Sequence, residues 1–80
     1  MEMYLGTILL IALSNDHVPR EFLPCDGRSL RIRDNQALYS LLLNRFGGDT
    51  VNYFNLPKLD APAPNLVYVI CVQGLYPSSM

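Results

Sequence analysis

Two apolar stretches stand at the two ends of the chain, and both alternate like β-strands. In residues 4–13 both alternating sets are apolar, with Tyr4, Ile8, Leu10 and Ala12 on one side and Leu5, Leu9, Ile11 and Leu13 on the other. Residues 66–75 follow the same pattern. A strand that is apolar on both faces is covered on both sides. We therefore predict that the terminal strands are neighbours in one sheet, and that another copy of the chain supplies part of their cover.

Shorter elements are predicted between the terminal strands. Residues 22–25 form a strand, but Pro24 cannot donate to a ladder and confines it to a sheet edge or an irregular segment. Asp26 and Gly27 then predict a tight turn with Gly27 at positive φ. Residues 29–32 form a second short strand.

A helix is predicted over residues 34–45. The carboxylate of Asp34 suits the free N–H groups of the first turn, and Arg45 suits the negative end of the helix dipole. Gly47 and Gly48 then end the helix by supplying a left-handed cap. Its apolar stripe faces the core and consists of Ala37, Leu38, Leu41, Leu42 and Phe46.

These elements predict the α+β class, with a small sheet of terminal strands plus short strands and one packed helix. Residues 60–64 hold two prolines and predict a stiff, extended connection to the last strand. Eighty residues suffice for one domain, 1–80. A chain of this size hides only about 60% of its unfolded surface, yet 50% of its residues are hydrophobic and 16% are charged. This apolar excess also favours a homo-oligomer.

The charge pattern excludes several partners. The net charge is −1, with 6 basic and 7 acidic residues and no basic run, so we expect no nucleic-acid polymer as a partner. Glu2 stands where a signal peptide would be basic, and the following apolar run is too short to span a bilayer as a helix. We therefore expect neither a signal peptide nor a transmembrane segment, and no membrane partner.

No pattern of catalytic, cofactor-binding or metal-binding residues stands out. Cys25, Cys71 and His17 lack the paired spacing of a zinc site, and we predict two buried free thiols and a solvated loop histidine. Asp26 and Asp49 could in principle act as an acid–base pair. Because both stand beside glycines in turns, backbone capping is the favoured role.

Four motifs follow one another between the terminal strands. They are Pro-x-x-Phe-Leu-x-Cys-Asp-Gly at 19–27, Asn-Gln-Ala-Leu-Tyr-Ser-Leu-Leu at 35–42, Phe-Gly-Gly-Asp at 46–49 and Phe-Asn-Leu-Pro-Lys-Leu at 54–59. In their sequences and in their order they resemble the motifs of the phage tail collar domain family. The resemblance covers residues 4–59 and implies a tail-collar-like fold. Residues 65–77 resemble the last strand of the microcystin-dependent-protein-like branch, in its short form. The motif residues expected to have structural roles are Phe22, Cys25, Asp26, Gly27, Gly47, Gly48, Asp49, Leu56 and Pro57.

The sequence departs from the family in three places. Phe22 replaces the usual Trp, Lys58 replaces an Asp, and residues 60–64 replace an Arg-Gly-Arg run and a long glycine-rich region. The fold therefore carries over, but the role of a long adsorption fibre does not.

Two functional hypotheses remain. The first is a non-catalytic collar or fibre-type structural protein, located in the virion or the host cytoplasm. It assembles with itself, as the trimer that the resemblance implies, and other phage tail proteins are further candidate partners. The second is a small oligomeric protein that holds a nucleotide or metabolite signal at subunit boundaries, near Arg28, Arg31, Arg33 and Tyr39.

Overall fold

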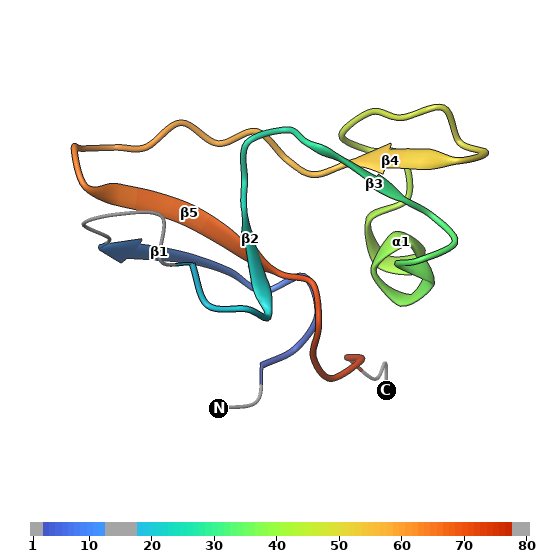
Figure 1. The fold of residues 1–80 in the computed structure, drawn as a ribbon, viewed down its shortest axis with the longest axis horizontal. Coiled ribbons are helices and arrows are strands. Elements are labelled where there is room, and N and C mark those ends of the chain that lie inside the picture. The colour runs from blue at the N-terminus through green and yellow to red at the C-terminus, as the bar shows by residue number, and fades with distance from the viewer. Residues whose placement is uncertain (1–2, 13–17, 78–80) are drawn as a thin grey trace.

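Two small antiparallel sheets and one helix form the fold of residues 3–12 and 18–77, the part of the chain that this computed structural model describes (Figure 1). In chain order the elements are β1 (Ile8–Ala12), β2 (Phe22–Pro24), β3 (Ser29–Arg31), α1 (Gln36–Leu42), β4 (Tyr53–Asn55) and β5 (Leu66–Cys71). The predicted α+β class is confirmed. Figure 1 shows β1, β5 and β2 on one side of the molecule and β3, β4 and α1 on the other.

The terminal strands pair with each other, as the sequence predicts. The larger sheet has the order β1-β5-β2, and β1 runs antiparallel to β5 with Ile8 opposite Ile70 and Ala12 opposite Leu66. Both strands are shorter than predicted. Residues 4–7 form a turn in which the N–H of Thr7 donates to the carbonyl of Tyr4. Beyond Cys71 residues 72–74 form a bend, and the N–H of Val72 donates to the carbonyl of Glu21. Leu13 and His17 lie outside the described residues.

Strand β2 lies at the edge of the larger sheet, where Pro24 is tolerated. It pairs with β5 alone among the described strands, with Phe22 opposite Cys71 and Pro24 opposite Val69. Proline has no N–H to donate. At a sheet edge no neighbouring strand needs that hydrogen bond, so its absence costs nothing. The predicted edge position of this strand is confirmed.

Helix α1 is shorter than predicted at both ends. It begins at Gln36 after the cap residue Asn35, whose side chain donates to the carbonyl of Arg31 and makes no capping bond. It ends at Leu42, because Leu43 takes a positive φ of 53° while its N–H donates to the carbonyl of Tyr39. The predictions that Asp34 opens the helix, that Arg45 occupies its last turn and that the glycines at 47–48 end it are therefore wrong.

The apolar stripe of the helix is buried only in its middle. Leu38 is fully buried, Leu41 and Leu42 are half-buried, and Ala37 and Phe46 are exposed. Only about one turn of this short helix contacts the core. The chain then leaves the helical path before Phe46 could follow the stripe.

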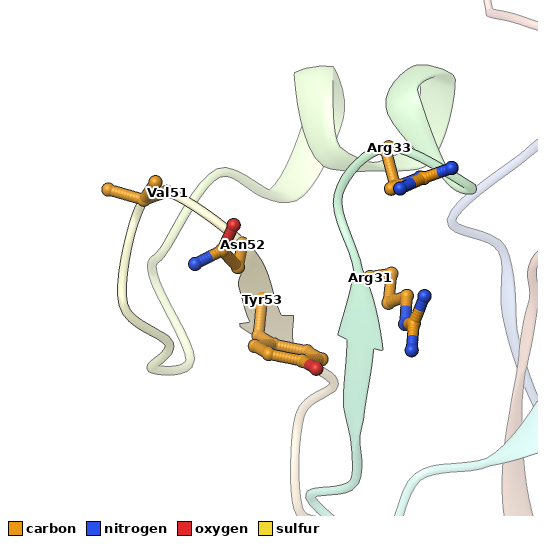
Figure 2. Close-up of a pocket in the computed structure, with 5 residues that line it drawn as sticks. All are labelled: Arg31, Arg33, Val51, Asn52 and Tyr53. Carbon is orange, nitrogen blue, oxygen red and sulfur yellow. The ribbon is translucent and has the colours of Figure 1, made fainter.

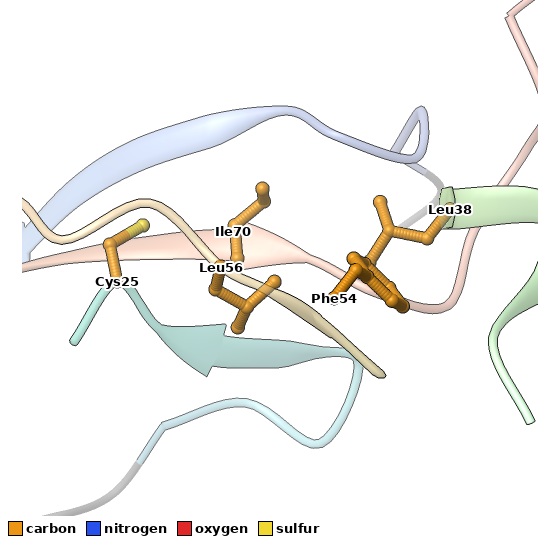
Figure 3. Close-up of a cluster of buried hydrophobic side chains, with 5 residues drawn as sticks. All are labelled: Cys25, Leu38, Phe54, Leu56 and Ile70. Atoms are coloured by element: carbon orange, nitrogen blue, oxygen red, sulfur yellow. The ribbon is translucent and has the colours of Figure 1, made fainter. Parts of the chain in front are cut away.

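A single buried cluster joins the two sheets to the helix (Figure 3). It contains Cys25, Leu38, Phe54, Leu56 and Ile70. The half-buried ring of Tyr39 adds an aromatic contact, its centroid 5.3 Å from that of Phe54. A second cluster, of Phe22, Val69 and Cys71, is also built around β5. Because neighbouring residues of a strand point to opposite faces, Val69 and Ile70 anchor β5 on both of its faces within one chain.

Candidate functional site

The Cys-Asp-Gly motif meets the Leu-Pro-Lys-Leu motif at the crossing between the two sheets. The N–H of Leu59 donates to the carbonyl of Cys25, and Asp26 and Lys58 form an isolated β-bridge. Gly27 has a φ of 82°, as predicted, and a β-carbon on it would lie 3.3 Å from that of Lys58. These two motifs therefore hold the chain in place as it crosses from one sheet to the other.

Around residues 47–49 the backbone passes close to β4. Gly48 forms a β-bridge with Phe54, and a β-carbon on Gly48 would lie 2.5 Å from the carbonyl oxygen of Tyr53. The next residue, Asp49, closes the loop that leads into β4. Its Oδ1 accepts from the N–H groups of Val51, Asn52 and Tyr53 at 2.9, 2.7 and 2.9 Å. These donors lower the pKa of Asp49 to about 2.

Asp26 is engaged in a different way. It accepts the backbone N–H of Arg28 at 3.1 Å, and its Oδ2 forms an ion pair of 2.9 Å with the Arg28 guanidinium. The bonds from Arg28 lower the pKa of the Asp26 carboxyl below its usual value. Both acids of the conceivable acid–base pair therefore serve local structure, as the capping interpretation predicts.

Both thiols lie in the core. Cys25 and Cys71 are free and buried, and burial raises the pKa of each thiol above its usual value. A raised pKa disfavours the thiolate, which is the reactive form. Within residues 3–12 and 18–77 no three His, Cys, Asp or Glu side chains gather to hold a metal ion.

The four residues of the ligand-binding hypothesis do not come together. Arg28 is bound to Asp26, and Tyr39 packs on Phe54 in the core. Arg31 and Arg33 do line one hollow (Figure 2). The other lining residues, which the sequence did not single out, are Val51, Asn52 and Tyr53. The pairing of β3 with β4 brings residues 51–53 next to residues 31–33. Because the two segments lie far apart in the sequence, no local sequence signal could have identified Val51, Asn52 and Tyr53 as lining residues.

Strand β1 exposes an apolar surface. Ile8, Leu9 and Leu10 are 41%, 36% and 44% exposed, although they alternate between the two faces of the strand. In the described part of the chain β1 pairs only with β5, so its outer edge has no strand beside it. This combination, which we call the β1 surface, is the candidate contact surface of the protein.

Comparison with known proteins places this fold in a family. The Phage Tail Collar Domain family matches residues 6–64, close to the range that the motifs predict. No curated protein and no solved structure matches the chain significantly. The likeness of residues 65–77 to one branch of the family lies outside the match and stays a prediction. Among the described residues no helix is long and apolar enough to cross a membrane. The chain belongs to the phage tail collar domain family, which points to a structural role in the phage tail.

Proposed function

We propose that the protein is a non-catalytic collar or baseplate-like part of the virion, and that it assembles with copies of itself through the β1 surface. Exposure of Ile8, Leu9 and Leu10 is the observation that carries this proposal. Apolar side chains grouped on an unpaired strand edge favour association, because contact removes them from water and gives the backbone hydrogen-bond partners. Other phage tail proteins are further partners of the assembled form.

Three copies are the state that the family resemblance implies. A side chain such as Leu stabilises by about 1.5–3 kcal/mol when it moves from full exposure to full burial. The three residues of the β1 surface retain 36–44% of their exposure. Burying any one of them in a contact between copies therefore stabilises that contact by about 1 kcal/mol. Every copy contributes the same side chains from the contacting face of β1, which multiplies the gain in a symmetric assembly.

Light scattering behind a sizing column tests this proposal. The chain has a mass of 9.0 kDa, so three copies give 3 × 9.0, or about 27 kDa. Leu9→Asp and Leu10→Asp place a charge on opposite faces of β1. We expect at least one of them to shift the protein towards the single-chain mass, and the sensitive position identifies the face that forms the contact.

Val51→Asp is the matched control. Val51 is 73% exposed and lies in the loop before β4, outside the β1 surface. This variant should retain the mass of the unaltered protein. A protein that stays at 9.0 kDa at high concentration would contradict the proposal. Equal dissociation of the Val51→Asp variant would also contradict it, because the contact would then not be specific to β1.

A further inference from the structure

The two-stranded ribbon of β3 and β4 has an inner and an outer face. Leu30 stands opposite Phe54, and both contact the core. Arg31 stands opposite Tyr53, and alternation directs both to the other face. The chain thus places a cation and an aromatic ring next to each other on the outer face of the ribbon.

The pairing continues one step beyond the ribbon. The N–H of Ile32 donates to the carbonyl of Asn52 at 2.9 Å, which keeps the two segments side by side after β3 ends. Arg33 follows two positions after Arg31, in the turn beyond β3. Figure 2 shows Arg31 on β3, Arg33 in this turn, and Asn52 and Tyr53 on the neighbouring segment, and all four line the hollow. The hollow measures about 310 Å³, which is enough for a small molecule.

The arginines of this hollow are not neutralised in the way that Arg28 is. Arg31 has no ion pair within residues 3–12 and 18–77. Nε of Arg33 lies 3.8 Å from Oδ1 of Asp34, and both side chains are largely exposed, so this ion pair is weak. Asp49, two residues before Val51, is an acid of the same loop. Three N–H donors partly offset its charge.

We propose that this hollow binds a small oxyanion, a phosphate or carboxylate group that Arg31 and Arg33 hold between them. A guanidinium presents two parallel N–H donors to such a group, and charge-assisted bonds of this kind are among the stronger polar contacts. The exposed ring of Tyr53 and the amide of Asn52 contact the remainder of the ligand. The site lies on the β3–β4 ribbon and does not include the β1 surface.

Calorimetric titration with pyrophosphate and with citrate tests the site at low ionic strength. Arg31→Gln and Arg33→Gln should each weaken binding about tenfold, because each removes one charge-assisted contact. Arg45→Gln, which removes the same charge from an exposed position outside the hollow, should retain the affinity. Binding of pyrophosphate alone identifies a phosphoryl ligand, and binding of citrate alone identifies a carboxylate ligand. Binding of both probes shows that the site recognises negative charge without distinguishing the two groups.

Two results would overturn the oxyanion site. One is the absence of heat with both probes. The other is an equal loss of affinity in Arg45→Gln, which would show attraction to the whole surface of the protein. The masses of the three arginine variants should equal that of the unaltered protein, because none alters β1. Dissociation of the assembly would therefore be measured separately from failure of the oxyanion site.

Discussion

Strands β5 and β1 have similar apolar sequences and opposite environments. Val69 and Ile70 of β5 are 1% and 0% exposed, on opposite faces of the strand. Leu9 and Ile8, their register partners on β1, are exposed. The difference follows from position, because β5 has a strand on each side and a buried cluster on each face, whereas β1 lies at the sheet edge.

This comparison shows that a two-faced apolar strand does not by itself require a second copy of the chain. For the half of β5 that ends at Cys71, the chain provides the cover on both faces. The expectation that both terminal strands keep a face for a subunit contact therefore stays a prediction for β1, and the buried half of β5 has no such face. Charged substitutions at Val69 or Ile70 test folding, and substitutions in β1 test assembly.

The largest expected effect comes from one register pair, Ile70→Asp and Ile8→Asp. An unpaired carboxylate in place of Ile70 costs several kcal/mol, a large part of the roughly 5–15 kcal/mol that stabilises a typical domain. We expect Ile70→Asp to be insoluble or unfolded. We expect Ile8→Asp to stay folded, and to lose the assembled mass where the face that carries Ile8 and Leu10 forms the contact. Soluble yield measures solubility, circular-dichroism melting measures folding, and light scattering measures the assembled mass. Equal damage by both variants would remove the contrast between the two strands.

A smaller effect is expected from Gly74→Ala, which tests how the end of β5 is covered. A β-carbon on Gly74 would contact the carbonyl oxygen of Met3 and lie 2.9 Å from Sγ of Cys71. Overpacking of this kind typically costs about 1–3 kcal/mol. Thermal melting should show the loss, while Gln73→Ala, an exposed neighbour, should melt like the unaltered protein. An unchanged melting temperature for Gly74→Ala would show that residues 3–5 are not packed firmly on this end of β5.

The smallest effect is expected at Asp49, which lies outside both terminal strands. Its folded pKa of about 2 is below the usual value, so its contribution to stability is complete above about pH 4 and is lost as the pH falls through about 2. Asp49→Ala should melt at a lower temperature than the unaltered protein at neutral pH, and this difference should narrow in that acidic range. The assembled mass should not change. A difference that is independent of pH would contradict this role of the carboxylate.

Several features could be predicted from the sequence because their causes are local. Alternating apolar residues identified the terminal strands and their pairing, and Pro24 identified the strand edge. Asp26 and Gly27 identified the positive φ at Gly27, because few other residues tolerate that conformation. The predicted tight turn does not join its neighbouring strands, because β2 and β3 lie in different sheets. The ordered motifs identified the family.

Only the tertiary structure decided the rest. The apolar stripe continued past Leu42, but Leu43 adopts a left-handed conformation and ends the helix. The register of β3 and β4 brings Tyr53 next to Arg31, 22 positions earlier in the chain. The choice of which apolar strand lies in the centre of the sheet left β5 buried and β1 exposed. Hydropathy along the chain shows which side chains favour burial, but the places available in the core depend on contacts between segments far apart in sequence.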